Sequence, residues 1–269
     1  YWDSFLESFT LMAGLAAATD RIGLFPSISI LSQHPAVVAR MIATIDDISG
    51  GRCGLNIVTG WNRPEYAQMG MWPGDAHYQR RYDYAAEYVQ ILQALWQSGR
   101  ASWDGEYFSL DDCSVLPTPN HSIPLVCAGQ SPAGREFVAR YADHQFVLTS
   151  EDNLVTSVED IRAKSVISGR NVGIYALFHM ILADTDEMAE AHVHRIIDAA
   201  DHGAISNILA SASLDTNTGG TSDQLKAALD QDVETGNMAF MGIPVIDGSA
   251  ETVRQRIEVI VKRTGIDGM

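Results

Sequence analysis

The sequence contains little cysteine and no long apolar run. Its three cysteines, Cys53, Cys113 and Cys127, lie far apart, and none belongs to a C-x-x-C pair. An odd number of isolated cysteines argues against a disulfide framework and against a cysteine-based zinc site, and it fits a reducing compartment. No apolar run approaches the ~20 residues that cross a bilayer, and no basic-then-apolar leader opens the chain. We therefore expect a cytoplasmic protein that is not inserted in a membrane.

Basic residues are also scarce, with 18 Lys and Arg against 34 Asp and Glu, which gives a formal net charge of −16. Such a charge repels both nucleic acid and an anionic lipid surface, so neither is expected as a partner. Hydrophobic residues make up 46% of the 269 residues, which is enough for a sizeable core. We therefore expect one large domain over residues 1–269, because α/β barrels reach this size without splitting.

Motifs that carry their own catalytic chemistry are missing. The sequence has no G-x-S-x-G elbow, no phosphate-binding P-loop, no G-x-G-x-x-G turn and no H-E-x-x-H metal motif. His34, His77 and His179 fall in separate predicted elements, and each is better explained as a cap, surface or packing residue than as a metal ligand. With no nucleophile, metal site or acid pair, the sequence points to chemistry brought by an organic cofactor.

Apolar segments alternate with segments of helical spacing. The apolar segments predict strands at residues 21–31, 53–59, 124–130, 144–150 and 171–183. Helices are predicted at residues 3–18, 34–51, 77–98, 131–142, 186–201 and 249–265, with a further helix after a capping-box-like Ser157 to Asp160. Residues 101–117 predict a hairpin that turns at Asp104-Gly105, and the polar, Gly-rich residues from about 203 to 236 predict a mobile insertion. The alternation indicates an α/β fold, either a parallel sheet or a barrel.

Polar residues late in apolar strands are the first candidates for a site, because ligands of α/β barrels lie at the carboxyl ends of the strands. Five segments supply such residues: Ser27 and Ser29; Asn56, Thr59 and Trp61; Gly129 to Ser131; Thr149 and Ser150; and His179. An unpaired buried amide costs about 1–3 kcal/mol, so Asn56 either bonds a neighbouring backbone group or faces a ligand. Trp61 favours the ligand, because an indole beside a polar strand end suits the wall of a pocket for a flat ring.

Two further segments are suited to an anion. Arg80 and Arg81 open a helix, where the helix dipole disfavours cations, so a nearby anion would explain them. Alternatively they form a solvated turn that pairs with one of three acids: Asp75, Asp83 or Glu87. Ser131 ends a Gly-Gln-Ser turn at a predicted helix start, where free N–H groups and a hydroxyl suit a phosphate. Ser131 also suits plain N-capping, and the two roles are compatible.

The combination of short motifs resembles a known family. The matching segments are ISGGR at 48–52, NIVTGW at 56–61, EYAQMG at 65–70, WPGD at 72–75, RRYDY at 80–84 and CAGQS at 127–131. Together they resemble the bacterial-luciferase-like flavin monooxygenases, and within these the pyrimidine monooxygenases, which open the uracil ring. The similarity is dense up to about residue 143, looser at 172–200 and faint in the predicted insertion. The motifs are specific for the group, although its members oxidise several unrelated substrates.

The resemblance implies a TIM barrel, the (β/α)8 fold, that holds reduced FMN at its carboxyl-terminal face. The family's flavin-binding positions fall on Asn56, Glu65, Arg81, Tyr82 and Ser131, and the last three suit the phosphate end. The resemblance also implies that Asn56, Trp61 and Ser27 surround the N5 edge of the flavin, where dioxygen docks. Ser27 departs from the threonine of near relatives and slightly enlarges this oxygen pocket. No metal is expected in the site.

The resemblance further implies that the barrel is incomplete at both termini in this chain. Family members begin with a strand, a helix and a strand before the segment that matches Tyr1, and they finish a strand after the segment that matches Met269. We therefore expect unpaired sheet edges near residues 22–30 and 172–183. Four apolar side chains there are expected to be poorly covered: Ile22, Leu24, Ile174 and Leu177.

These implications define the expected function. A separate NAD(P)H-dependent flavin reductase supplies reduced FMN, dioxygen reacts in the pocket, and one oxygen passes to a uracil- or thymine-type pyrimidine whose ring opens. The same family features also fit a monooxygenase of sulfones, sulfonates or aminopolycarboxylates, a deazaflavin-dependent reductase that works without oxygen, or a non-catalytic flavin-binding relative. We also expect a homo-oligomer and a transient contact with the reductase.

Overall fold

The computed structural model describes residues 5–217, 219–220, 222–223, 226–227 and 238–269. The chain divides into two compact units, which we describe one at a time. The amino-terminal unit runs to Cys127 and also includes Tyr141–Asp143, and the carboxy-terminal unit comprises Ala128–Arg140 and His144–Met269.

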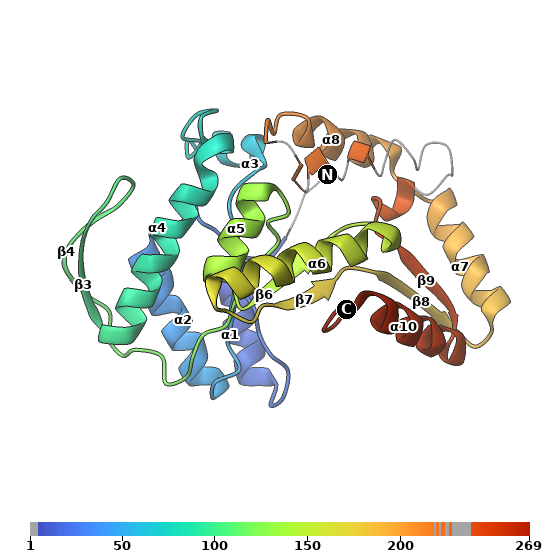
Figure 1. The fold of residues 1–269 in the computed structure, drawn as a ribbon, viewed down its shortest axis with the longest axis horizontal. Coiled ribbons are helices and arrows are strands. Elements are labelled where there is room, and N and C mark those ends of the chain that lie inside the picture. Colours follow the sequence, from blue (N-terminus) through green and yellow to red (C-terminus); the bar gives the residue numbers. More distant parts are fainter. Residues whose placement is uncertain (1–4, 218, 221, 224–225, 228–237) are drawn as a thin grey trace. The chain divides into compact units, whose positions relative to one another are not determined.

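The amino-terminal unit combines helices, parallel strands and one antiparallel hairpin, and Figure 1 labels the helices and the hairpin. Its helices are α1 (Ser8–Ala18), α2 (Pro35–Ser49), α3 (Arg63–Ala67) and α4 (His77–Ser98). Its strands are β1 (Ser27–Ser29), β2 (Leu55–Val58), β3 (Arg100–Asp104), β4 (Ser109–Ser114) and β5 (Leu125–Cys127). Strand β2 pairs in parallel with β1 on one side and with β5 on the other. The predicted α/β alternation is therefore confirmed here.

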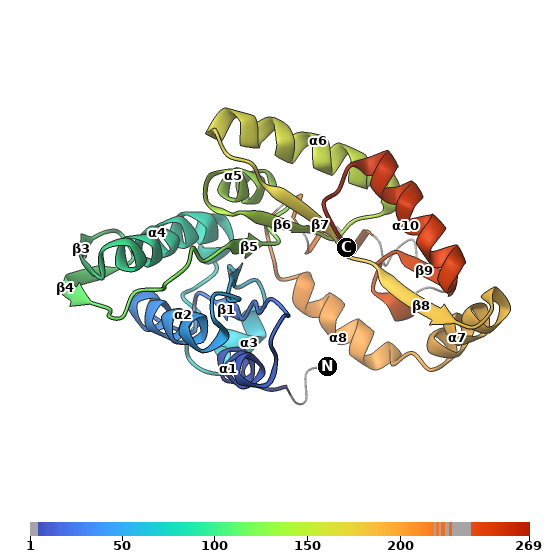
Figure 2. The same ribbon diagram turned by 90° about the horizontal axis from the view of Figure 1, so that it is seen from below.

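Helix α2 forms where local signals predict it. The imidazole of His34 accepts a hydrogen bond from the N–H of Ala36, Pro35 occupies the first turn, and Gly50 ends the helix with φ 63°. Ile42 and Ile45 lie on the buried face of α2, and α4 packs beside this helix (Figure 2). Each fully buried Ile contributes about 1.5–3 kcal/mol to the burial term. This pair of helices supports the strands that carry the predicted site residues.

A buried carboxylate anchors the hairpin β3–β4 to α4. Glu87 of α4 accepts hydrogen bonds from Trp103 Nε1 at 3.1 Å and from the main-chain N–H groups of Glu106 at 3.1 Å and Phe108 at 2.9 Å. The predicted hairpin is confirmed. Glu87 was one of three acids considered as alternative partners of the basic turn, and Arg80 does not pair with it. Arg80 pairs with Glu106 instead, because the folded hairpin brings that carboxylate to the start of α4.

The carboxy-terminal unit also has parallel strand pairs. Its helices are α5 (Pro132–Tyr141), α6 (Glu151–Ser168), α7 (Asp186–Asp198), α8 (His202–Ala212) and α10 (Ala250–Thr264), with a 3-10 turn at Met238–Phe240. Its strands are β6 (His144–Val147), β7 (Gly173–Ala176), β8 (His179–Ala183) and β9 (Val245–Ser249). Strand β6 pairs with β7, and β8 pairs with β9, both in parallel.

Residues 171–183 form two strands rather than the single strand we predicted. β7 pairs with β6, whereas β8 pairs with β9, so the chain changes partner between Ala176 and His179. The apolar pattern runs on through this change, and alternation alone does not reveal which partner each half meets. Strand β9 itself was not predicted, because VIDGS is short and contains Gly248, a residue that weakens a strand pattern.

The predicted start of the helix after β6 is wrong. Helix α6 begins at Glu151 with Ser150 at its N-cap, and the Ser157 hydroxyl donates to the Asn153 carbonyl inside the helix. Back-bonding to the preceding turn is the alternative role of a serine within a helix. The proposed insertion at 203–236 contains α8, whose N-cap Asp201 accepts from the N–H of Ala204. Residues 218, 221, 224–225 and 228–236 of that range lie outside the described residues.

The expectation of an unpaired edge at residues 172–183 is wrong. The N–H of Asp267 donates to the carbonyl of Ile174 at 2.8 Å, and the N–H of Ala176 donates to the carbonyl of Gly268 at 3.0 Å, so residues 267–268 cover β7. Ile174 is accordingly 0% exposed. Leu24, which bridges to Cys53, is 2% exposed, so the expectation that these two side chains are poorly covered is wrong. The side chains of Ile22 and Leu177 are exposed, at 60% and 44%, as expected.

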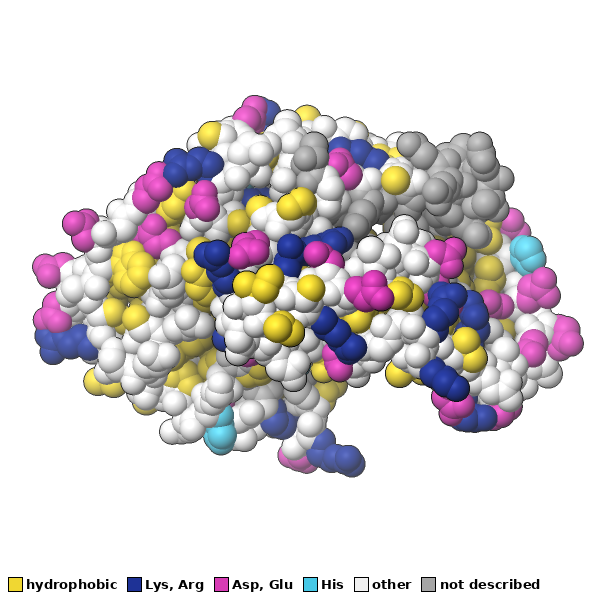
Figure 3. All heavy atoms as spheres, in the orientation of Figure 1, with side chains coloured by type: hydrophobic (Ala, Val, Ile, Leu, Met, Phe, Trp, Pro, Cys, Tyr) yellow, Lys and Arg dark blue, Asp and Glu magenta, His cyan; other side chains and the backbone are white. Residues whose placement is uncertain are grey.

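Charged side chains of both signs are interspersed on the surface drawn in Figure 3. On α10, for example, Arg254 pairs with Glu251 and Glu258. None of the helices that the structure describes combines the length and the apolar character that a membrane crossing requires.

Candidate functional site

Polar side chains share one face of the parallel strands in the amino-terminal unit. Ser27 of β1 lies directly opposite Asn56 of β2 in the strand register, and Ser29 lies opposite Val58. Successive side chains of a strand point to opposite faces, so Ser27, Ser29 and Asn56 lie on the same face. The opposite face is apolar and buried, with Ile28 and Ile57 each 2% exposed. The structure thus brings two of the predicted catalytic residues, Ser27 and Asn56, together on the polar face of β1 and β2.

The amide of Asn56 is held in one orientation. Its Nδ2 donates a hydrogen bond to Ser27 Oγ at 2.9 Å. Its Oδ1 is buried and receives no hydrogen bond from any residue that the structure describes. A buried acceptor left in this state costs about 1–3 kcal/mol, and such cases in native proteins call for a ligand, a water or a functional explanation. The arrangement is therefore prepared to accept a hydrogen bond from a bound molecule.

The turn after β2, which carries Trp61, is fixed by a histidine. His77 Nε2 lies 2.8 Å from the carbonyl oxygen of Thr59, so this nitrogen carries the proton that it donates. The ring of Trp72 contacts His77 edge-on at 5.4 Å between centroids. Of the cap, surface and packing roles expected for His77, the structure shows packing. Trp61 is half-buried directly after this fixed turn.

Helix α3 places two adjacent titratable residues near the strand ends. Glu65 is half-buried, and desolvation raises the pKa of its carboxyl, although a hydrogen bond from Asn62 Nδ2 at 3.4 Å opposes the shift. Burial likewise raises the pKa of the Tyr66 phenol to about 12. The Ser29 hydroxyl donates to Tyr66 Oη at 2.6 Å. Sequence reasoning missed Tyr66, because nothing in a five-residue helix indicates that its side chain reaches back to β1.

Two neighbouring arginines of α4 have different environments. Arg80 is exposed and pairs with Glu106, whereas Arg81 is only 4% exposed and its guanidinium carbon lies 5.5 Å from the ring centroid of Tyr82. A buried guanidinium is stabilised by negative charge or hydrogen-bond acceptors, and a bound anion can be one of these. Its place in the second turn of α4 gains nothing from the helix dipole. Both facts suit Arg81 to an anionic ligand group.

Ser131 belongs to the carboxy-terminal unit, where it caps α5. Its Oγ accepts hydrogen bonds from the N–H of Gly134 at 3.1 Å and from Asn217 Nδ2 at 3.3 Å, so the N-capping prediction is confirmed. A hydroxyl has two acceptor lone pairs and one donor hydrogen, and both lone pairs are used here. Within the described ranges nothing accepts the Ser131 hydrogen, which leaves it for an acceptor such as a phosphate oxygen. Asn217 carried no sequence signal, because this contact joins segments far apart in the chain.

The predicted site residues are divided between the units. Ser27, Asn56, Trp61, Glu65, Arg81 and Tyr82 belong to the amino-terminal unit, and Ser131 belongs to the carboxy-terminal unit. Among the described residues, no group of three or more His, Cys, Asp or Glu side chains is arranged to hold a metal ion.

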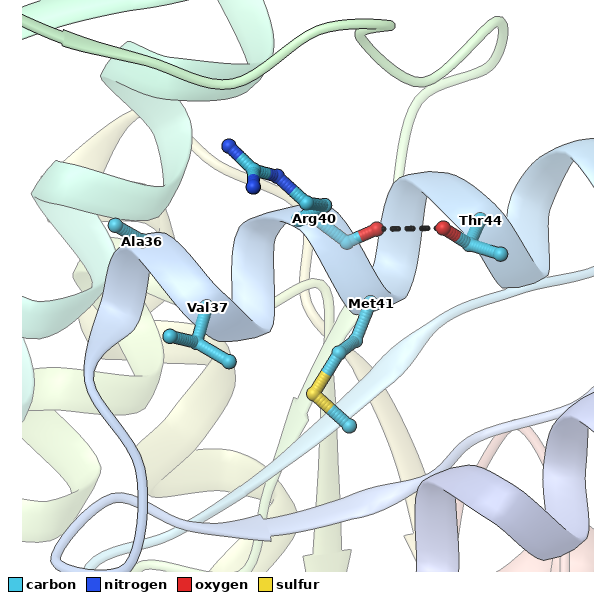
Figure 4. A pocket seen from close by; sticks show the side chains of 5 residues that line it. All are labelled: Ala36, Val37, Arg40, Met41 and Thr44. Atoms are coloured by element: carbon cyan, nitrogen blue, oxygen red, sulfur yellow. Dashed lines mark hydrogen bonds between the residues drawn. The ribbon is translucent and has the colours of Figure 1, made fainter.

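A surface hollow on α2 is separate from these residues. It is lined by Ala36, Val37, Arg40, Met41 and Thr44, all from one helix (Figure 4). The Thr44 hydroxyl donates to the Arg40 carbonyl at 2.9 Å, and Arg40 Nη2 donates to the Ser114 carbonyl at 3.0 Å, so the polar groups of the hollow are largely occupied. The hollow contains none of the predicted site residues and offers no convergent polar groups for catalysis.

The chain is similar to known proteins over its whole length. Residues 1–268 match the family described as luciferase-like monooxygenase. Pyrimidine monooxygenase RutA of Methylobacterium radiotolerans is 44% identical over 273 residues, which cover 100% of this chain and 70% of that protein. Pyrimidine monooxygenase RutA of Escherichia coli is 42% identical, with 100% and 74% covered. The solved structure of EDTA monooxygenase from Chelativorans sp. BNC1 is 20% identical and shares the fold, with a TM-score of 0.79 over 98% of this chain and 71% of that one.

Proposed function

We propose that this chain, which belongs to the luciferase-like monooxygenase family, uses reduced FMN and dioxygen to oxygenate a uracil- or thymine-type pyrimidine and open its ring. The family match confirms the resemblance seen in the motifs. The identity of 44% to a protein named pyrimidine monooxygenase favours this substrate over the sulfones, sulfonates and aminopolycarboxylates that also fit the family.

The observation that carries the proposal is the orientation of Asn56. Its Nδ2 is committed to Ser27 Oγ at 2.9 Å, and its buried Oδ1 is left to accept a hydrogen bond. Reduced FMN fits this residue, because the central ring of a reduced flavin presents an N–H donor at N5. When bound, reduced FMN supplies the two electrons that activate dioxygen. Asn56 and Ser27 orient the reacting edge by fixed hydrogen bonds, which is electrostatic preorganisation.

The other residues are assigned to binding in the same proposal. Arg81 and Tyr82 bind the phosphate end, supported by the burial of the Arg81 guanidinium. Ser131, whose Oγ accepts from the N–H of Gly134 and from Asn217 Nδ2, is assigned to phosphate binding by its own family position. Glu65 binds the flavin, and Trp61 borders the oxygen pocket at the flavin N5 edge. These assignments are carried over from the family positions, and the burial of Arg81 and the hydrogen bonds of Ser131 support two of them.

The proposal also includes the surroundings of the reaction. A separate NAD(P)H-dependent flavin reductase supplies the reduced cofactor, the protein is a cytoplasmic homo-oligomer, and the contact with the reductase is transient. The support is the family match together with the absence of a nicotinamide-binding G-x-G-x-x-G turn from the sequence.

The experiment uses the native protein, FMN, a flavin reductase with NADH, and a panel of pyrimidines, sulfones and aminopolycarboxylates. Isotopically labelled dioxygen and mass spectrometry follow the product. We expect one labelled oxygen in a ring-opened product from uracil or thymine. Labelled product from a sulfone alone would reassign the substrate, and FMN binding without any labelled product would indicate a non-catalytic relative.

A further inference from the structure

A second pair of hydroxyl groups lies on the polar strand face, and the proposed chemistry gives it no role. Ser29 is two residues after Ser27 on β1 and faces the same side. Its Oγ donates to Tyr66 Oη at 2.6 Å. Two residues of a strand span about 6.6–6.8 Å, roughly the width of a six-membered ring with its substituents. This pair therefore lies about one ring away from the Ser27–Asn56 pair.

The hydrogen-bond accounting leaves this pair with one donor and one acceptor. Ser29 uses its hydrogen toward Tyr66, so the lone pairs of Ser29 Oγ remain open to a donor. The Tyr66 phenol has its own hydrogen, and no residue in the described part of the chain accepts it. Burial raises the pKa of this phenol to about 12, so it stays protonated at neutral pH. Ser29 is half-buried and keeps accessible surface.

The pair is held rigidly. Tyr66 is only 3% exposed and stacks on Trp72 with 6.3 Å between ring centroids and 23° between planes. Gly60 passes close to it with φ 77°: a Cβ there would lie 3.5 Å from the Tyr66 ring and 2.8 Å from Leu31. The Ser29 carbonyl accepts two hydrogen bonds from Ser32, one from its N–H at 2.9 Å and one from the Ser32 hydroxyl at 2.7 Å. A preorganised donor and acceptor are thus presented at a fixed spacing.

We propose that Ser29 and Tyr66 read the amide edge of the substrate, with the Tyr66 hydroxyl donating to a ring carbonyl and Ser29 Oγ accepting from the adjacent ring N–H. This inference rests on the proposed function. In a cyclic amide the nitrogen and the carbonyl oxygen are about 2.3 Å apart, from ordinary bond lengths. That spacing is close to the 2.6 Å between the two hydroxyl oxygens.

The pairing selects a class of substrate. Uracil and thymine carry N–H groups next to carbonyls and match both hydroxyls. A sulfone or sulfonate offers only acceptors, so it meets Tyr66 and leaves Ser29 without a donor. A site that is built to hydrogen-bond a substrate group discriminates strongly against an analogue that lacks it. Cyclic amides and imides are therefore the substrates that this strand face favours.

The test measures kcat/KM for uracil, 1-methyluracil and 3-methyluracil in native protein, Tyr66→Phe and Ser29→Ala. Each variant deletes one hydroxyl and should raise KM for uracil roughly three- to tenfold, the range of a single neutral hydrogen bond. Native protein should disfavour the methyl derivative that blocks the contacted N–H, and Ser29→Ala should lose most of this preference. If the two hydroxyls were purely structural, each variant would lower kcat/KM for uracil and for both methyl derivatives by the same factor. Tyr107→Phe and Ser98→Ala are the matched controls and should keep native values.

Calorimetric titration of uracil into the FMN-loaded protein gives a readout independent of turnover. Weaker uracil binding in both variants, with unchanged FMN affinity, supports the assignment. If native protein oxidises uracil and the two variants keep its KM and its preference among the methyl derivatives, the assignment is wrong and the proposed function stands. If native protein neither binds nor oxidises any pyrimidine, both are wrong.

Discussion

At the residue scale, the amide of Asn56 has two different halves. Nδ2 is satisfied by Ser27, and Oδ1 is buried without a donor among the described residues. A residue retained for stability alone would gain little from this arrangement, because the buried acceptor offsets the single hydrogen bond. The cost is consistent with a residue kept for what it binds.

Replacing Asn56 with leucine separates folding from chemistry. Asn56→Leu is nearly isosteric and removes the orphan acceptor, so the free energy of unfolding should change by less than about 1 kcal/mol while product formation is lost. Urea unfolding and product assay on the same preparation check both parts. Asn120→Leu, in an exposed loop, is the control and should keep product formation. A destabilised Asn56→Leu whose folded fraction turns over normally would show that the amide is structural.

Glu65 predicts a pH dependence with a definite sign. Burial raises the pKa of its carboxyl in the folded state, so its favourable contribution is present below the unfolded pKa and is lost as pH rises through the folded pKa. Glu65→Gln should therefore stabilise the protein relative to native at pH 7, and the difference should vanish near pH 4.

Asp186 gives the opposite sign, because hydrogen bonds from Ser249 and Thr252 lower its pKa. Asp186→Asn should lower the free energy of unfolding at pH 7 and should leave it unchanged at acidic pH. Urea unfolding of Glu65→Gln and Asp186→Asn at both pH values tests the two opposite signs.

At the scale of elements, the hairpin β3–β4 depends on one carboxylate of a neighbouring helix. Glu87 gathers the N–H groups of the hairpin turn and the indole of Trp103. The turn signal at Asp104-Gly105 determines the local bend, and Glu87 determines where the hairpin docks. A hairpin of two strands is at best marginally stable alone, so this anchor is what holds it in place.

Glu87→Gln tests the anchor. The amide keeps the shape but replaces one accepting oxygen by a donor that faces other donors, so we expect a loss of roughly 1.5–3 kcal/mol in the free energy of unfolding. Hydrogen exchange at the amides of Glu106 and Phe108 should accelerate as well. Glu106→Gln removes only the exposed pair with Arg80 and should cost less than about 1 kcal/mol. Equal effects of the two variants would contradict the anchoring role.

At the scale of the whole molecule, binding of reduced FMN should raise the free energy of unfolding and the Tm. A ligand that binds only the folded state at 100 times its Kd adds about 2.7 kcal/mol, which corresponds to a rise in Tm of roughly 5–10 °C for a chain of this size. We expect this rise with reduced FMN under anaerobic conditions. Arg81→Ala should weaken FMN binding about tenfold, from the loss of a charge-assisted hydrogen bond, and should roughly halve the rise at the same FMN concentration.

Arg80→Ala is the matched control for this measurement. Arg80 is the adjacent residue, has the same charge and is bonded to Glu106 on the surface, so its loss should leave the FMN-induced rise unchanged. If Arg80→Ala and Arg81→Ala behave alike, the effect is one of general charge, and Arg81 does not bind the phosphate.

The sequence by itself determined the family, the α/β class and the helices whose signals are local. The spans of α2, α4 and α10 follow from caps and apolar spacing, and the capping role of Ser131 follows from its turn, because these features depend on residues within a few positions of one another. The pairing of Ser27 with Asn56 was expected only through the resemblance and through the meeting of the strands' carboxyl ends.

Only the tertiary structure decided which distant groups meet. It split residues 171–183 between two sheet partners, covered β7 with residues 267–268, joined Asn217 to Ser131 and brought Tyr66 to Ser29. Each of these contacts joins segments that are far apart in the chain or in separate elements, and no local pattern distinguishes one remote partner from another. Burial decided the rest: it separated the exposed Arg80 from the buried Arg81, although the two arginines are chemically identical and adjacent in sequence.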